Sequence, residues 1–197
     1  MLKKLKENLK KYFQFLTLTS LGFIILGSLL SFSSQDNAVY NFDSTLKDYN
    51  NILGYSGALV SDLLLRAFGH TSYFLPIFLL YNGLRLVTKR EIKWYSFATL
   101  PLFIILISFF SVVFINELSL TELQGGFLGE ALFYYFQTFF GPNSHYYYFL
   151  TGLAVITIFG LAITFNIGLK NILKLFQVIK NLTFFIIQLI LRRRVKL

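Results

Sequence analysis

The sequence predicts an all-α integral membrane protein with four transmembrane helices and with both ends in the cytoplasm. Composition is the first reason: 55% of the 197 residues are hydrophobic and the mean hydropathy is +0.63, more than a soluble domain of this length needs for its core. The second reason is the presence of four long apolar stretches separated by polar segments. The third is that lysine and arginine gather at the two ends and in one loop. Cysteine is absent, which excludes disulfides, thiolate metal ligands and thiol catalysis.

The first predicted span covers residues 12–32, after a basic tail over 1–11. These residues carry no charge, and a helix of this length reaches ~31 Å, enough to cross the hydrocarbon core. A cleaved signal peptide is the alternative, but the apolar stretch is long and Ser31 to Ser34 lack a small-x-small cleavage site. The polar residues 33–56 follow as an external loop, because a stretch so rich in Asn, Asp and Ser does not enter lipid.

The second and third predicted spans cover about residues 71–87 and 95–115, with a short basic turn between them. Arg85 lies near enough to the end of its span to extend its charge to the interface, and Trp94 and Tyr95 mark the interface at the start of the next span. The fourth span is predicted over 146–165, after a Gly-Pro-Asn-Ser sequence that interrupts a longer uncharged stretch.

The last segment, residues 166–197, alternates lysines with apolar positions, and its uncharged stretch is too short to cross a bilayer. It is predicted to be a basic amphipathic helix on the cytoplasmic surface. Its final Arg192-Arg193-Arg194 and Lys196 could also contact DNA phosphates, although juxtamembrane cations usually reflect topology and anionic lipid.

The placement of positive charge gives the orientation. All but two of the 18 lysines and arginines lie in residues 3–11, 85–93 or 170–196, the exceptions being Lys47 and Arg66. Because positive charge marks the cytoplasmic side, these three segments are predicted to be inside. Most of the acidic residues fall on the other side, which agrees with this orientation.

A pattern of glycines occurs twice, 72 residues apart. The positions are Gly54, Gly57 and Gly69 in the first copy and Gly126, Gly129 and Gly141 in the second. The residues between the second and third glycine form a helix of only ~17 Å, so residues 57–68 and 129–140 are predicted to be short helices at the outer interface, with sharp turns at the third glycines. The chain then consists of two hairpins in a parallel repeat. Coincidence is the alternative, since glycine is common in membrane helices.

Three motifs resemble those of a known family. Leu29–Asp36 reads LLSFSSQD and is similar to the "SLLSYSPxDPS" that ends the first span of FtsK and SpoIIIE anchors. Asn51–Pro76 is similar to that family's "N-x-x-G-x-x-GA-x-x-AD-x-x-x-x-x-FG-x-x-A-Y-x-x-P", and Gln124–Gly129 resembles the "GGxxG" before its fourth span. The matching positions of the second motif are Gly54, Gly57, Ala58, Asp62, Phe68, Gly69, Tyr73 and Pro76. The resemblance covers about residues 15–165, but the prolines of the first motif are replaced by Ser34 and Asn37.

The resemblance implies the N-terminal four-helix membrane anchor of the FtsK/SpoIIIE DNA translocases. Its expected role is to hold a hexameric, ATP-driven DNA pump at the division septum in the bacterial inner membrane, and to contact other division proteins. We expect DNA contact only through the family's motor domain, which we expect to be absent because the sequence stops just after the fourth span. No GxxxxGK[ST] phosphate loop occurs, so we expect no ATPase activity and no cofactor.

Two pairs of residues outside the glycine pattern are candidates for chemistry. Asp62 and Arg66 are four apart on a predicted helix, so a local ion pair is favoured over a proton or ion site. His70 and His145 precede two spans, but two histidines without a third ligand are weak support for a metal site. No catalytic arrangement stands out.

Two other functions stay open. A small transporter or channel subunit should show charged or interrupted helices near the bilayer midplane, and the sequence offers only Pro76 there. A stand-alone membrane interaction protein is the other possibility.

Overall fold

The computed structural model describes residues 2–36, 49–88, 92–118, 125–141 and 145–168, together with Gln177. All regular structure within these ranges is helical. The elements are α1 (Leu2–Leu30), α2 (Gly54–Phe68), the 3₁₀ helix η1 (Gly69–Tyr73), α3 (Phe74–Val87), α4 (Tyr95–Leu118), α5 (Gly126–Phe140) and α6 (His145–Thr164). The basic segment predicted over 166–197 lies outside the described residues, except for 166–168 and Gln177.

Four apolar helical stretches are long enough to cross a membrane, which confirms the all-helical class with four spans. They are Leu5–Leu30, Gly54–Val87, Tyr95–Phe114 and Tyr146–Thr164. The first helix begins at Leu2, within the segment expected to be a tail. The second stretch contains α2, η1 and α3, and the 14 residues of α3 reach only ~21 Å. The five residues of η1 add ~10 Å, so η1 and α3 together match the hydrocarbon thickness.

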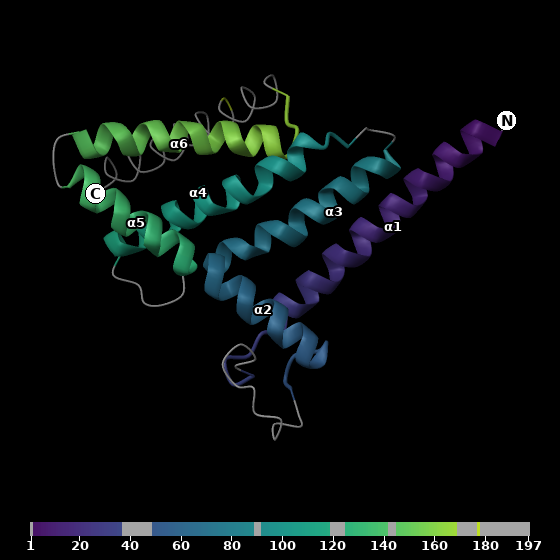
Figure 1. Cartoon of the computed structure of the whole chain (residues 1–197), viewed down its shortest axis with the longest axis horizontal. Coiled ribbons are helices and arrows are strands. Elements are labelled where there is room, and N and C mark those ends of the chain that lie inside the picture. The colour runs from purple at the N-terminus through teal and green to yellow at the C-terminus, as the bar shows by residue number, and fades with distance from the viewer. Residues whose placement is uncertain are drawn as a thin grey trace, which may run out of the picture.

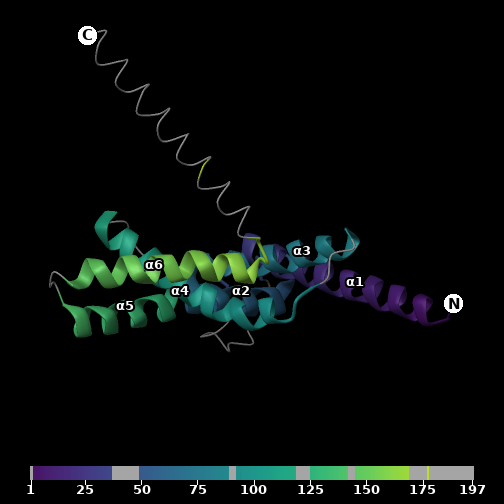
Figure 2. The same ribbon diagram turned by 90° about the horizontal axis from the view of Figure 1, so that it is seen from above.

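The chain folds as two halves that lie side by side (Figure 1). In the first half, α1 packs along α3 and contacts α2, and in the second, α4 packs against both α5 and α6. The short helices α2 and α5 contact each other and so connect the halves. Seen from above, the described helices form a flat assembly with α1 and α6 toward opposite edges (Figure 2).

Glycines bring α1 and α3 into close contact. A Cβ atom added to Gly22 of α1 would lie 2.9 Å from Cγ of Leu80, and one added to Gly83 of α3 would lie 2.6 Å from Cγ2 of Thr19. Each helix therefore offers a glycine to a side chain of the other, as small residues do between membrane helices.

Aromatic side chains fill the space between α3 of the first half and the helices of the second half. Phe78 of α3 is fully buried and stacks edge to face with Phe97 and Phe165, at ring-centroid distances of 5.0 and 5.8 Å. Phe103 also contacts Phe165, at 6.0 Å. Such pairs contribute roughly 0.5–1.5 kcal/mol each beyond the area that they bury.

The two short helices have the same backbone construction. Each has 15 residues and begins three residues before the predicted boundary, at Gly54 or Gly126, and both of these glycines have φ of +62°. Each ends before a glycine with positive φ, +62° at Gly69 and +51° at Gly141. The amide of that glycine donates to the carbonyl of Leu65 in the first copy and of Gln137 in the second, which are also 72 residues apart. The sequence repeat is thus a repeat of structure.

Alanine substitutions at three glycines should separate backbone strain from crowding. A Cβ on Gly126 would lie 2.5 Å from the backbone nitrogen of Gly69, whereas Gly54 has nothing within 4 Å. Gly54→Ala should lower the free energy of unfolding by ~1–2 kcal/mol, because alanine is unfavourable in the left-handed conformation of this residue. Gly126→Ala should cost roughly 1–3 kcal/mol more because of overpacking. Thermal unfolding in lipid nanodiscs measures both losses.

The matched control is Gly152→Ala. Gly152 lies in α6 with no heavy atom within 4 Å of an added Cβ, so this change should be neutral or stabilise the helix by up to about 1 kcal/mol. Equal stability of the Gly126 and Gly152 variants would show that the close approach of α5 to α2 does not contribute to the fold.

Candidate functional site

A buried carboxylate fixes the chain just before α2. Asp36 follows α1 and is only 5% exposed. Its Oδ1 accepts the backbone N–H of Asn50 at 2.8 Å and its Oδ2 accepts that of Asn51 at 3.0 Å. Hydrogen bonds to an ionised carboxylate are stronger than neutral ones, so this pair holds the end of the first half's loop against the end of α1.

Asn51 connects the last turn of α1 to the first turn of α2. Its side chain is 3% exposed, and Nδ2 donates to the carbonyls of Ser28 at 2.8 Å and Ser31 at 3.3 Å. Its Oδ1 accepts the N–H of Leu53 at 3.1 Å, and its own carbonyl accepts the N–H of Gly54 at 2.8 Å. The last carbonyls of a helix have no partner within the helix, so Asn51 satisfies that of Ser28 in the last turn of α1 and also that of Ser31 just after the helix.

Gly57 is the glycine that makes room for Asn51. A Cβ on Gly57 would lie 2.1 Å from Oδ1 of Asn51. The carbonyl of Gly57 accepts hydrogen bonds from Ser28 Oγ at 2.5 Å and Ser61 Oγ at 2.9 Å. Asp36, Asn51, Ser28 and Ser61 are all buried, and with Gly57 they form what we call the α1–α2 clamp.

Asp62 and Arg66 form an ion pair on α2. Arg66 Nε lies 2.6 Å from Asp62 Oδ1, as the four-residue spacing predicts. The Asp62 side chain is 3% exposed and that of Arg66 is 39% exposed, so the carboxylate is inside the fold and the guanidinium reaches its surface.

Ser108 of α4 joins the two halves beside α2. It is fully buried, and its Oγ lies 2.8 Å from the carbonyl of Ile104 in its own helix, 3.2 Å from that of Phe68 and 2.6 Å from Oγ1 of Thr71. A Cβ on Gly129 would lie 2.6 Å from the Ser108 carbonyl oxygen. Gly126 also lies against the backbone of Gly69. Together these contacts pack α4 and α5 directly against the backbone at the end of α2.

A second polar contact joins the halves at the opposite end of α3. Asn166, just after α6, has φ of +50°, and its side-chain oxygen, in the orientation that satisfies both groups, accepts from the two terminal nitrogens of Arg85 at 2.9 and 3.1 Å. The Arg85 guanidinium also lies over the ring of Tyr81, at 5.8 Å from its centroid. Arg85 therefore lies near the end of its span and also forms hydrogen bonds with the second half of the chain.

The structure gives the predicted residues different surroundings. Gly54 begins α2 in open space, whereas Gly69, Gly126 and Gly129 gather around Ser108. Gly141 ends α5, and Pro76 is buried near the start of α3. His70 is exposed. Among the described residues, no three His, Cys, Asp or Glu side chains gather as metal ligands would.

Sequence reasoning did not single out Asn51 or Ser108. Asn51 opens the "N-x-x-G" motif, and that spacing was the available signal, because a residue three before a left-handed glycine can cap the turn. Ser108 is one of two serines in an apolar stretch, with Ser111 as the other, and it carried no signal.

Comparison with known families shows which protein family this helical arrangement belongs to. A family model described as the 4TM region of DNA translocase FtsK/SpoIIIE matches residues 7–176. The chain belongs to this family. A search of the curated proteins and a search of the solved structures each found no match.

Membership of the FtsK/SpoIIIE 4TM family fits the four apolar helices and makes the chain a multi-pass membrane protein in contact with the lipid bilayer. The α1–α2 clamp, the Asp62–Arg66 pair and the contacts of Ser108 all lie within the matched residues. They are therefore features of the membrane domain of a DNA translocase, and what they provide is a fixed arrangement of helices.

Removing the Asn51 side chain should destabilise the fold. Asn51→Ala removes the buried side chain to which the Ser28 carbonyl and the Leu53 amide are bonded. Leaving a buried polar group without a partner lowers the free energy of unfolding by roughly 1–3 kcal/mol. Asn50→Ala is the control, because Asn50 is exposed and its hydrogen bond to Asp36 comes from the backbone. Thermal unfolding of the two variants in the same lipid compares them, and equal stability would contradict the capping role of Asn51.

Proposed function

We propose that this chain is the membrane anchor and septal-targeting module of a DNA translocase that acts in cell division and chromosome segregation. The match to the FtsK/SpoIIIE 4TM family over residues 7–176 carries this proposal. The chain itself catalyses no reaction in this proposal, because its sequence contains no phosphate-binding loop. DNA contact then belongs to the motor of the translocase.

The proposal includes a topology in the bacterial inner membrane with both termini in the cytoplasm. The segregation of lysine and arginine into residues 3–11, 85–93 and 170–196 supports it. The end of the fold that contains Arg85 and Trp94 is then cytoplasmic, and α2 and α5 lie at the outer interface. Burial along α2 supports an interfacial position, because one face is buried and the other is exposed.

The contacts of the buried polar groups favour an anchor over a conducting pathway. In the α1–α2 clamp the side chains of Ser28, Asp36 and Asn51 are bonded to backbone of the neighbouring helix or turn, and that of Ser61 is bonded to backbone of its own helix. Asp62 has its counter-charge one turn away on the same helix. Groups with fixed partners stabilise one arrangement of the helices, whereas a transport site must exchange its partners for ions or substrate.

Assembly into a hexamer and contact with other division proteins complete the proposal. The outer helices α1 and α6 bury the smallest shares of their apolar stretches, 17% and 11%. They therefore present apolar surface to lipid and to neighbouring copies.

Single cysteines should report the topology, because the chain has none of its own. An impermeant thiol reagent added outside the cell should label Thr45→Cys in the external loop and Val60→Cys on the exposed face of α2. It should not label Arg90→Cys in the cytoplasmic turn. Labelling is measured by mass shift on gels.

Ser61→Cys is the matched control for Val60→Cys, since Ser61 is fully buried and adjacent in sequence. It should stay unlabelled until the protein is denatured. Labelling of Arg90→Cys from outside would reverse the topology. Protection of Val60→Cys would place α2 inside a bundle or in lipid, and the interfacial position would then be wrong.

Septal targeting can be seen with a fluorescent protein fused after Leu197, of a kind that matures only in the cytoplasm. In dividing cells of the host that encodes the chain, we expect a fluorescent band at the division site. The band should exceed that of a membrane dye, which is stronger there only because two membranes lie close together. A fusion that is fluorescent but follows the dye would keep the cytoplasmic C-terminus and contradict the targeting role.

A further inference from the structure

We propose that a cavity between α1, α3 and the start of α4 binds the headgroup of an anionic phospholipid of the phosphatidylglycerol type. The cavity has a volume of about 520 Å³. Pockets that hold small ligands lie in the range of roughly 300–1,000 Å³, so a headgroup and the first part of an acyl chain fit this space. The assignment to the inner leaflet rests on the topology proposed above.

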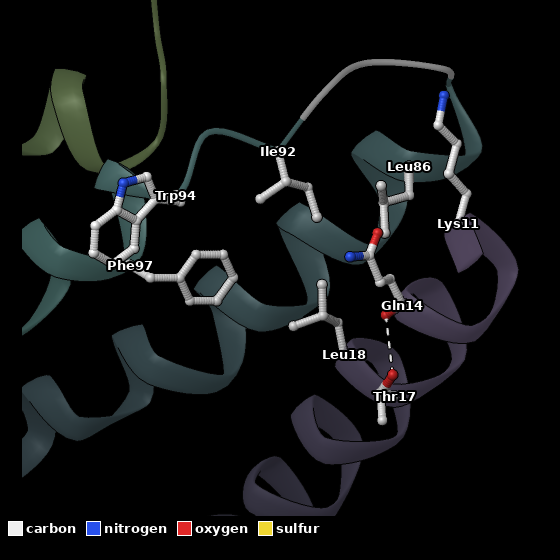
Figure 3. A pocket seen from close by; sticks show the side chains of 8 residues that line it. All are labelled: Lys11, Gln14, Thr17, Leu18, Leu86, Ile92, Trp94 and Phe97. Atoms are coloured by element: carbon white, nitrogen blue, oxygen red, sulfur yellow. Dashed lines mark hydrogen bonds between the residues drawn. The ribbon is translucent and has the colours of Figure 1, made fainter. Parts of the chain in front are cut away.

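One wall of the cavity carries its polar groups. Lys11, Gln14 and Thr17 line it from α1, and their spacing of three residues places them along one face of that helix (Figure 3). Lys11 supplies a cation and Gln14 an amide N–H, both of which suit a phosphate. The Thr17 hydroxyl donates to the carbonyls of Phe13 and Gln14, so its oxygen is available to accept a hydrogen bond from a hydroxyl of the headgroup.

The remaining wall is apolar. Leu18 comes from α1, Leu86 comes from α3, and Ile92 and Phe97 close the side toward α4 (Figure 3). A free phosphate would gain nothing from these side chains. A phospholipid would place its phosphate near Lys11 and the beginning of an acyl chain against the apolar wall, and so it uses both surfaces.

The cavity lies at the depth of the headgroups in the proposed topology. Lys11 immediately precedes the first predicted span, and Trp94, which also lines the cavity, is 81% exposed. Tryptophan is enriched at membrane interfaces because its ring is amphipathic. Lys93 lies over the ring of Tyr95, at 5.5 Å, and adds positive charge on the same side.

Charge argues against the chain's own C-terminal segment as the occupant. Residues 170–196 carry seven lysines and arginines and no acidic residue, so they would meet Lys11 as like charges. An anionic lipid meets it as an opposite charge. Basic pockets between membrane helices on the cytoplasmic side are known to select such lipids.

Trp94 makes the proposal testable, because it is the single tryptophan of the chain. The full chain is placed in phosphatidylcholine vesicles that contain a small fraction of either brominated phosphatidylglycerol or brominated phosphatidylcholine, with bromine near the start of one acyl chain. Bromine quenches tryptophan fluorescence on contact. We expect the site to bind phosphatidylglycerol roughly five-fold more tightly than phosphatidylcholine. This ratio corresponds to the binding free energy of about one lysine at a membrane surface.

Lys11→Gln should remove this preference, and Lys10→Gln should keep it. Lys10 is the matched control because it is also an exposed lysine of α1 but does not line the cavity. Leu86→Phe is a second test that keeps the charge: by filling the cavity it should reduce quenching by phosphatidylglycerol.

Equal quenching by the two brominated lipids in the unaltered chain would overturn the proposal, since Trp94 would then sense bulk lipid or an otherwise filled cavity. A preference lost equally in the Lys10 and Lys11 variants would also overturn it, because it would reflect diffuse attraction to the basic helix. Both leaflets of the vesicle have the same composition, so the result does not depend on orientation. A failure of septal targeting would leave this assay unaffected.

Discussion

The packing of this membrane domain depends on the missing side chain of Gly126. Because this residue has no Cβ and adopts φ of +62°, the first turn of α5 lies against the backbone of Phe68 and Gly69. That approach places α4, which packs along α5, where Ser108 reaches the Phe68 carbonyl and Thr71. The joint between the two halves is therefore made of backbone and small polar groups, and a larger residue at one position would separate all of them.

The surroundings make these polar contacts more important than their number suggests. A carbonyl at a helix end that is buried in the fold has no water to replace a lost partner, so it must be satisfied by the protein. Asn51 does this for the end of α1, and at the end of α2 the Phe68 carbonyl is satisfied by the Thr71 hydroxyl at 2.6 Å and by Ser108 at 3.2 Å. Asn51 and Ser108 at the same time connect elements distant in sequence. In this fold, the hydrogen bonds that satisfy the helix ends are also the ones that fix the tertiary arrangement.

What the sequence predicts here follows from how local each interaction is. Hydropathy locates the four spans because the bilayer acts on each helix separately, and spacing predicts the Asp62–Arg66 pair because both residues are on one helix turn. The glycine pattern predicts two short helices, but their starts lie three residues earlier, because a glycine with positive φ can stand at the first position of a helix.

Contacts between distant segments were not predictable in this way. Gly83 faces Thr19 and Gly22 faces Leu80 across the α1–α3 contact, and nothing in either local sequence distinguishes these glycines from others in membrane helices. The partners of Asn51 and Ser108 are equally remote in sequence, and so are the two sides of the cavity beside Lys11.

The two copies of the repeat share their backbone but not their chemistry. On α2, Asp62 pairs with Arg66, and Asn51 holds the start of the helix. On α5, the side chains of Phe127, Tyr134, Tyr135 and Phe139 are each more than half exposed, and the exposed Glu130 and Gln137 form no counterpart to the Asp62–Arg66 pair. Aromatic side chains of this kind suit a membrane interface. A transport site built on the repeat would need matching polar groups in both copies, whereas a scaffold needs only matching geometry, and matching geometry is what the two short helices have in common.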